Sequence, residues 1–384
     1  MKKPFISRVV INNYKSIAHC DVRLGALQFL VGRNGAGKSN FLDALAFVRD
    51  VLEFNNLESA AGDVKIFHKR EWEVQSNLGM EIEFNLPNGA NGVFAFRLAR
   101  RELEPVVVEE SCWIQQDGET KKYKTQDGEL LSDDPQRFPP VASDRFYLQN
   151  MSAYDAFRPL YDALRKIEIY NFVPQKIPRI DTISNFWFMS DGRNIAQIVS
   201  DLTDGAQNRI QEYLQLVVPD IHGFRVRKVG GESREGKYLE FLHKAGGFFH
   251  ENISYGTLRA LCVLTALLQE RQSGGNNHPV LIGIEEPENG IHARAIRSLL
   301  GAMVEAADMR QVIVATHSTE MLDSEEIASE QILPVEMCDS GTIIAPMNDI
   351  TKKMLRKHLT TVGELLRQDQ LEPQKTSFVS DSNK

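Results

Sequence analysis

A glycine-rich run near the start of the chain has the residue types of a phosphate-binding loop. It reads Gly32-Arg33-Asn34-Gly35-Ala36-Gly37-Lys38-Ser39, and Asn40 follows. Residues without a Cβ atom permit a tight turn whose backbone N–H groups point inward at a polyphosphate. In this pattern Lys38 reaches the β- and γ-phosphates and Ser39 ligates Mg²⁺. We therefore predict that the whole run, Asn40 included, lines a site for a nucleoside triphosphate.

Two acidic residues at the end of an apolar run form the second feature that could do chemistry. Val280 to Ile284 reads as a buried strand, and Glu285 and Glu286 follow it directly. Carboxylates beside a bound polyphosphate can act on a metal ion and on water. The phosphate loop and this acidic pair together predict an enzyme that hydrolyses ATP.

The residues around the loop predict the strand and the helix that must position it. Gln28 to Val31 is a short apolar strand that leads into the loop. From Asn40 to Leu52 the apolar residues Phe41, Leu45 and Val48 recur at helical spacing. A helix that begins here points its positive end at the bound anion.

A second pair of candidate phosphate contacts lies much later in the chain. Ser254 and Gly256 precede an apolar helix predicted over Ala260 to Gln269. A Ser-x-Gly sequence before a helix is by itself most often a simple N-terminal cap. Here it stands one helix and one loop before the acidic strand, and the next apolar strand, Gln311 to Ala315, leads to His317. The order of these motifs favours a contact with nucleotide.

This order of motifs resembles that of the ABC-type ATPases. The start Asn13-Tyr14-Lys15-Ser16-Ile17 and the inserts between the motifs are similar to the RecF/SMC branch. Residues 284–292 read Ile-Glu-Glu-Pro-Glu-Asn-Gly-Ile-His. They resemble the stand-alone AAA-family ATPases of bacterial defence and the ATPase part of the OLD (overcoming lysogenization defect) nucleases. The resemblance covers about residues 4 to 320 and implies the α/β fold of a P-loop NTPase with an ABC-type head.

The resemblance implies that two subunits share each ATP. Lys38 and Ser39 of one subunit would hold the phosphates together with Ser254 and Gly256 of another, in a head-to-tail dimer or higher homo-oligomer. Most family members have Gly-Gly-Gln after the signature Ser, whereas this chain has Tyr255-Gly256-Thr257. It keeps the Ser and the Gly that touch phosphate.

Catalytic roles follow from the same resemblance. Glu286 would polarise the attacking water, and His317 would contact the γ-phosphate beside Lys38. Glu285 and Ser39 would position Mg²⁺. Most P-loop ATPases have Asp where this chain has Glu285, but the longer carboxylate can hold the metal shell through water.

The resemblance also implies a glutamine that senses the γ-phosphate between the two lobes. Gln149 and Gln175 are the candidates, and we favour Gln149. By resemblance, Asn13, Lys15 and Ser16 could line the base or the phosphates of the nucleotide. A solvated turn explains these three residues equally well.

The spacing of apolar residues changes several times along the chain between the motifs. Alternating apolar residues mark a β-rich stretch after the first helix, and helical spacing follows it. No heptad pattern is sustained, so we expect no long coiled coil. The predicted segments are an N-terminal part of the ATPase core with the P-loop (1–63), a β-rich lobe (64–148), a helical insert (149–222), a C-terminal part of the core with signature, acidic strand and switch His (223–350), a C-terminal helix (351–371) and a disordered tail (372–384).

Composition limits the classes of protein that remain. A chain of 384 residues with 42% hydrophobic residues can bury a large core. The net charge of −8 gives no general attraction to nucleic acid. The four cysteines lie far apart, which argues against a zinc site or a disulfide framework. The chain has neither an apolar run of about 18 residues nor a signal peptide, so we predict a cytoplasmic protein without a membrane partner.

Two functional classes stay open. In the first, the chain is the regulatory ATPase of an anti-phage defence system and controls a nuclease or toxin effector supplied in trans, because too few residues follow His317 for a fused nuclease domain. In the second, it is a RecF-like DNA-binding ATPase of repair or recombination, which needs a local basic surface. The Glu-Glu-Pro-Glu segment favours defence. The candidate basic residues are Arg225, Arg227, Lys228, Arg234 and Lys237, and also Lys352, Lys353, Arg356 and Lys357.

Overall fold

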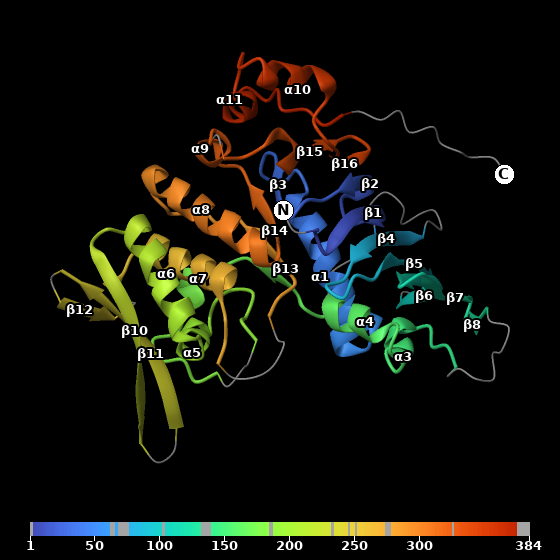
Figure 1. Cartoon of the computed structure of the whole chain (residues 1–384), viewed down its shortest axis with the longest axis horizontal. Coiled ribbons are helices and arrows are strands. Elements are labelled where there is room, and N and C mark those ends of the chain that lie inside the picture. The colour runs from blue at the N-terminus through green and yellow to red at the C-terminus, as the bar shows by residue number, and fades with distance from the viewer. Residues whose placement is uncertain are drawn as a thin grey trace.

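A sheet of thirteen strands runs through the computed structural model (Figure 1). The structure describes residues 3–61, 66–67, 77–101, 104–131, 140–183, 187–231, 234–244, 246–249, 252–272, 278–324 and 326–374. The strands of the large sheet are β1 (Ile6–Tyr14), β2 (Ile17–Arg23), β3 (Leu27–Val31), β4 (Leu78–Asn85), β5 (Asn91–Arg101), β6 (Glu104–Gln116), β7 (Glu119–Gln126), β8 (Glu129–Leu130), β9 (Ile167–Tyr170), β13 (Leu281–Glu285), β14 (Gln311–Thr316), β15 (Ile332–Cys338) and β16 (Gly341–Ile344). They follow the order β8-β7-β6-β5-β4-β1-β2-β16-β15-β3-β14-β13-β9.

One end of this sheet is parallel and the other is antiparallel. The strands β15, β3, β14, β13 and β9 all pair in parallel. Their carboxyl ends therefore meet at one edge, where the loop after β3 and the residues after β13 and β14 come together. From β2 through β1 to β8 the pairs are antiparallel, so the strands of the β-rich stretch extend the same sheet.

Helices cover both faces of the parallel strands. They are α1 (Lys38–Phe54), α2 (Leu57–Ala61), α3 (Leu148–Met151), α4 (Arg158–Leu164), α5 (Ile195–Ser200), α6 (Asp204–Val217), α7 (Tyr255–Leu268), α8 (Ala293–Met309), α9 (Thr319–Leu322), α10 (Asp349–Arg356) and α11 (Val362–Arg367), with short 3-10 turns at Pro174–Lys176 and Ser329–Gln331. Figure 1 shows α6, α7 and α8 packed together, and these three helices contact one another.

Successive side chains of the buried strands point to opposite faces of the sheet and so contribute to two hydrophobic cores. Leu30 and Ile313 belong to the core that includes the apolar residues of α1. Their neighbours Phe29 and Val314 point to the other face and belong to the core of α5 to α8. Because side chains alternate along a strand, a short apolar strand can support helices on both sides. The sheet thus fixes α1 and α7 relative to the same strand ends.

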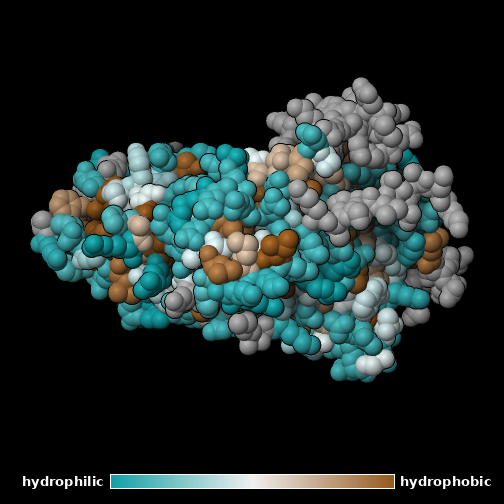
Figure 2. Space-filling model, turned by 90° about the horizontal axis from the view of Figure 1, so that it is seen from above, coloured by the Kyte–Doolittle hydropathy of each residue, from teal (hydrophilic) through white to brown (hydrophobic). Residues whose placement is uncertain are grey.

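A small second sheet of three strands is separate from the large sheet. It contains β10 (Ile221–Gly231), β11 (Arg234–His243) and β12 (Gly246–Phe249), and the β10–β11 hairpin projects from the body of the molecule (Figure 1). On the face seen in Figure 2, apolar side chains form small groups among hydrophilic ones. Of the helices in the part of the chain that the structure describes, none is long and apolar enough to cross a membrane.

Two predictions about secondary structure differ from the structure. The predicted helical insert, 149–222, contains the strand β9, which pairs with β13. A strand of four residues shows too little periodicity to be told from helix. The single C-terminal helix is two helices, α10 and α11, with His358 at φ +52° between them. Of the tail that is predicted to be disordered, Pro373 forms an isolated bridge with Met347, and residues 375–384 lie outside the described part, so disorder there stays a prediction.

Candidate active site

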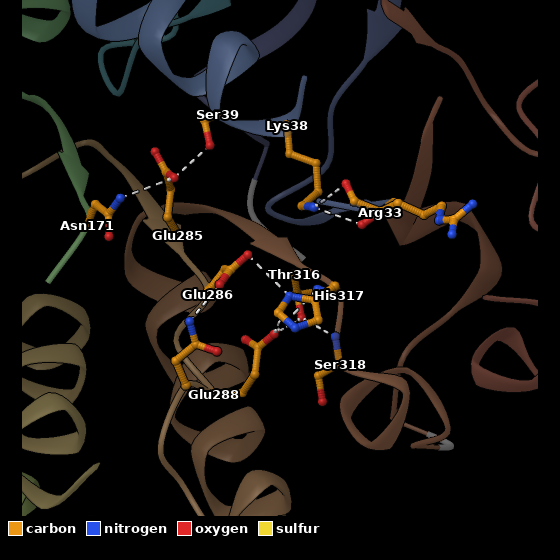
Figure 3. A network of polar contacts seen from close by, with 12 residues as sticks. Arg33, Lys38, Ser39, Asn171, Glu285, Glu286, Glu288, Thr316, His317 and Ser318 are labelled. Atoms are coloured by element: carbon orange, nitrogen blue, oxygen red, sulfur yellow. Dashed lines mark hydrogen bonds and ion pairs between the residues drawn. The ribbon is translucent and has the colours of Figure 1, made fainter. Parts of the chain in front are cut away.

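The carboxyl ends of the parallel strands enclose a cavity of about 250 Å³. Figure 3 shows the phosphate loop on one side of the site and the acidic residues with His317 on the other. The structure thus brings together motifs that lie more than two hundred positions apart in the sequence. The lining residues are Asn34, Gly35, Gly37, Lys38, Ser39, Asn40, Glu285, Glu286 and Ala315.

Lys38 is held inside the loop by backbone carbonyls. Its Nζ donates hydrogen bonds to the carbonyl oxygens of Gly32 at 2.7 Å and Arg33 at 3.0 Å. Burial lowers the pKa of Lys38, and the charges of Glu286, Glu288 and Glu285 oppose that shift. The ammonium group therefore lies at the base of the loop, where a phosphate oxygen can replace the carbonyls as acceptor.

The glycines of the loop are required by packing as well as by backbone conformation. Gly37 has φ +107°, and a Cβ atom there would lie 2.2 Å from the hydroxyl of Thr342. A Cβ atom on Gly32 would lie 2.1 Å from the carbonyl oxygen of Val335. Strands β15 and β16 thus press against the loop from outside the cavity. Larger residues would displace the loop from the position that its phosphate contacts require.

Hydrogen bonds among polar side chains hold the phosphate loop in place. The Thr342 hydroxyl donates to the carbonyl of Ala36 at 2.9 Å and contacts the Ser16 hydroxyl at 2.7 Å. Asn40 Nδ2 donates to the same Ser16 oxygen at 2.6 Å. The predicted site residue Asn40 lines the cavity, but its amide is directed to this support.

The structure places Asn13 near the end of β1 and Lys15 in the turn between β1 and β2. Lys15 Nζ forms an ion pair with Asp43 of α1 at 2.5 Å. Asn13 Nδ2 donates to the carbonyl of Asn77 at 3.1 Å. Neither residue lines the cavity of this chain. A contact of either side chain with nucleotide stays a prediction.

Ser39 and Glu285 both line the cavity and form a direct hydrogen bond. The Ser39 hydroxyl donates to Glu285 Oε2 at 2.7 Å, and Asn171 Nδ2 lies 3.4 Å from the same oxygen. Burial raises the pKa of Glu285. A hydroxyl and a carboxylate oxygen are the hard ligands that Mg²⁺ accepts, with its other positions filled by water and phosphate. Among the described residues no group of three or more His, Cys, Asp or Glu could hold a metal by itself.

Glu286 reaches the cavity from a constrained backbone. Its φ is +44°, and its N–H donates to the carbonyl of Ala315 on the neighbouring strand at 2.8 Å. One carboxylate oxygen lies 3.2 Å from His317 Nδ1, and the other accepts from Asn289 Nδ2 at 2.6 Å. Backbone conformations that are rare for residues other than glycine occur often at functional sites. The geometry joins the two predicted catalytic residues Glu286 and His317 in one pair.

The signature residues lie at the start of α7, outside the cavity of their own chain. The Ser254 hydroxyl caps α7 by accepting from the Thr257 N–H at 3.1 Å, and Ser254 itself is exposed. Gly256 is packed against Gly290, where a Cβ atom would lie 1.9 Å from the carbonyl oxygen. The helix therefore contacts the loop that follows the acidic pair, while Ser254 is not among the residues that line the cavity of the same chain.

Arg259 is a site residue that sequence reasoning missed. It is buried in α7 and donates to the carbonyls of Glu285 at 2.9 Å, Glu286 at 3.1 Å and Phe172. It thus attaches the signature helix to the backbone of the acidic pair. Asn171 was also missed. Its signal was a polar residue directly after the short strand β9, which reads Ile-Glu-Ile-Tyr.

The structure does not bring Gln149 to the phosphate loop, so this prediction is corrected. Gln149 lies in α3, which follows the segment where Asp144 accepts from the N–H of Leu57, just beyond the end of α1. The phosphate loop lies at the opposite end of α1, a helix of 17 residues that spans about 25 Å. Gln175 lies in the 3-10 turn after β9 and is not a lining residue either.

Comparison with known proteins agrees with this geometry. No curated protein sequence matches the chain. A solved SMC head bound to the C-winged helix domain of ScpA has a TM-score of 0.54 and 15% identity, covering 91% of this chain and 100% of that one. An SMC head with an extended coiled coil, bound to the C-terminal domain of ScpA from Pyrococcus furiosus, has a TM-score of 0.53 and 12% identity, covering 93% and 100%. These likenesses confirm the predicted fold.

A family model matches residues 27–323, which include the loop, the signature, the acidic pair and His317. Its description is "AAA domain, putative AbiEii toxin, Type IV TA system". The predicted ABC/SMC-like ATPase, related to the AAA ATPases of defence, is confirmed. The chain is an ATPase and belongs to this AAA family.

Proposed function

We propose that this ATPase works as a head-to-tail dimer or higher homo-oligomer and controls a nuclease or toxin effector of an anti-phage defence system, supplied in trans. One observation carries the catalytic part of the proposal. Lys38, Ser39, Glu285 and Glu286 line one cavity, and His317 contacts Glu286 at 3.2 Å. Each of these groups meets a different need of phosphoryl transfer to water.

In this proposal the residues act in sequence on the bound nucleotide. Lys38 exchanges its loop carbonyls for oxygens of the β- and γ-phosphates. Glu286 turns from Asn289 and His317 toward a water in line with the γ-phosphate and accepts its proton. His317 donates to a γ-phosphate oxygen, where charge develops in the transition state.

Ser39 and Glu285 are the residues that would hold Mg²⁺. Their oxygens are 2.7 Å apart, and Asn171 lies near the same carboxylate. The ion would neutralise charge on the β- and γ-phosphates. Within the chain, the raised pKa of Glu285 reflects a buried carboxylate that is short of positive partners.

A site shared between subunits explains why the signature residues Ser254 and Gly256 do not line the cavity of their own chain. Ser254 is exposed at the positive end of α7, a suitable place for a phosphate of another subunit. Gly256 packs on Gly290, four residues after Glu286, and Arg259 binds the carbonyl of Glu286. A shift of α7 caused by a neighbouring subunit would therefore also move the backbone of Glu286.

A role in defence draws support from the family and from the site. The family description names a toxin of a type IV TA system, a setting with two components. The Glu285-Glu286-Pro287-Glu288 segment resembles stand-alone defence ATPases. The part of the chain with assigned structure contains no cluster of His, Cys, Asp and Glu for a second, metal-dependent nuclease centre. A cytoplasmic ATPase that acts on a separate effector fits these features.

The RecF-like alternative would require an unneutralised basic surface. On the β10–β11 hairpin, Glu240 forms ion pairs with both Arg225 and Arg227. The side chain of Arg234 lies outside the described ones. Helix α10 carries Lys352, Lys353 and Arg356, of which Lys352 pairs with Asp349 at 3.9 Å and Arg356 with Glu330 at 3.7 Å. Binding of duplex DNA that weakens steeply with salt would support this alternative.

The Glu286→Gln variant tests the proposed mechanism. Glutamine keeps the shape of the side chain but cannot accept the proton of water. Hydrolysis should fall by about 10²- to 10⁴-fold while ATP still binds. With ATP, light scattering should show a larger species than without it, because the subunits stay closed on unhydrolysed nucleotide. Normal hydrolysis by the variant would show that Glu286 is not the base.

A further inference from the structure

Glu288 is a buried carboxylate beside the catalytic pair, and the mechanism above gives it no role. Its side chain is 7% exposed. One oxygen, Oε1, accepts a hydrogen bond from the Thr316 hydroxyl at 2.5 Å. The other, Oε2, is enclosed and has no hydrogen-bond partner among the described atoms. An enclosed carboxylate oxygen without a donor is unfavourable for stability, so the arrangement calls for an explanation from the site.

The contacts of Glu288 fix the backbone on both sides of His317. The N–H of His317 lies 3.4 Å from Glu288 Oε1. The Thr316 hydroxyl that donates to Glu288 also accepts from the N–H of Ser318 at 2.9 Å. A single carboxylate therefore joins the loop after β13 to the loop after β14. The imidazole of His317 is the part of this segment that can still turn.

The imidazole of His317 stands between two carboxylates, as Figure 3 shows. Its Nδ1 lies 3.2 Å from Glu286 Oε1 and 3.9 Å from Glu288 Oε1. Because both neighbours of Nδ1 are acceptors, we assign a proton to this nitrogen. Nε2 is then the nitrogen that can serve the γ-phosphate. The orientation of the ring depends on which carboxylate holds Nδ1.

We propose that Glu288 is a positioning residue for His317, an inference that rests on the role proposed for His317 above. When Glu286 turns to the attacking water, it leaves Nδ1 without its acceptor. Glu288 stays fixed by Thr316, and its Oε1, 3.9 Å from Nδ1, is the carboxylate oxygen that can accept a hydrogen bond from Nδ1 in its place. The ring then keeps Nε2 directed at the γ-phosphate during proton transfer to Glu286.

The Glu288→Gln variant separates this role from simple packing. Glutamine keeps the volume and one oxygen for Thr316, but that oxygen, which would also have to accept from Nδ1, carries no negative charge and is a weaker acceptor. We expect ATP hydrolysis to fall by about 10- to 100-fold, as for other carboxylates that orient a working imidazole, with ATP affinity unchanged. Glu320→Gln is the matched control, since Glu320 is exposed and its carboxylate lies 3.3 Å from the Ser318 hydroxyl. It should hydrolyse ATP normally.

A double-mutant cycle decides whether Glu288 acts through His317. The rates of Glu288→Gln, His317→Ala and the double variant are compared with wild type, and ¹⁵N NMR follows the protonation of His317 Nδ1. We expect the double variant to be no slower than His317→Ala, and Nδ1 to lose its proton in Glu288→Gln with an ATP analogue bound. Multiplying effects, or a normal rate for Glu288→Gln beside a slow His317→Ala, would overturn this inference alone. A normal rate for His317→Ala would instead contradict the proposed role of His317.

Discussion

A fully buried acid in the antiparallel half of the large sheet, Glu110, and a half-buried acid in the parallel half, Glu286, have different partners. In the antiparallel half Glu110 is fully buried and accepts from the Tyr123 hydroxyl at 2.6 Å and from the N–H groups of Tyr147 at 2.6 Å and Leu148 at 2.7 Å. In the parallel half Glu286 lines a cavity, with a histidine at 3.2 Å and an asparagine at 2.6 Å as partners.

This difference separates a structural carboxylate from a working one. All donors to Glu110 belong to fixed elements, because β7 and the start of α3 are packed around it. Glu286 can exchange its donors for water and phosphate-bound groups without disturbing a core. We therefore expect changes in the parallel half to affect ATP chemistry, and changes around Glu110 to affect folding.

Lys38→Ala should produce the largest change in ATP binding. The variant removes two or more charge-assisted hydrogen bonds to phosphate, so affinity should fall by at least about 100-fold. The fold should persist, because Nζ contacts only loop carbonyls in this structure. Calorimetric titration with ATP and a thermal melt measure the two effects. Wild-type affinity would show that the loop is not the phosphate site.

Arg259→Gln should affect the chemistry more than the binding. The variant loses donors to the carbonyls of Glu285 and Glu286, so the backbone of the acidic pair is less constrained. We expect kcat to fall by about 10-fold or more with little change in ATP affinity. Arg259→Lys should recover part of the rate because it keeps the charge. Equal loss of ATP affinity and kcat would place Arg259 in the binding of nucleotide instead.

Glu110→Gln should lower the stability of the fold and leave the rate of ATP hydrolysis unchanged. The amide leaves at least one of the three donors without its acceptor, at a cost of about 1–3 kcal/mol in the free energy of unfolding. Denaturant unfolding measures this loss. The rate of ATP hydrolysis per folded molecule should equal that of wild type. A folded variant with slow hydrolysis would break the distinction between the two halves.

The pH dependence of stability gives a finer test of Glu110. Burial raises its pKa from 4.5 to about 7, although the three donors oppose the shift. A carboxyl with a raised pKa in the folded state contributes stability below its unfolded pKa and loses it as the pH rises through the folded one. The wild-type free energy of unfolding should therefore fall between about pH 5 and 7. Glu110→Gln should show a smaller fall over this range.

The parts of the site that could be predicted are those with local signals. The phosphate loop, the acidic pair and His317 each follow a short apolar strand, and their residue types match their chemistry. β9 and Asn171 escaped prediction because a strand of four residues, Ile-Glu-Ile-Tyr, is too short for its residue pattern to distinguish strand from helix. Arg259 escaped because its partners are carbonyls of distant segments. The choice of Gln149 failed because chain order does not say which end of α1 a later helix reaches.

Mixing two inactive variants tests the shared site most directly. Lys38→Ala lacks its phosphate-binding lysine, and Ser254→Arg puts bulk and charge where a partner's nucleotide would lie. In a mixed dimer, one site joins the intact Lys38 of one subunit to the intact Ser254 of the other. We predict that each variant alone is inactive and that an equal mixture recovers about a quarter of the wild-type rate, because half of the randomly formed dimers contain one intact site. A mixture that stays inactive, or full activity of Ser254→Arg alone, would contradict the head-to-tail site.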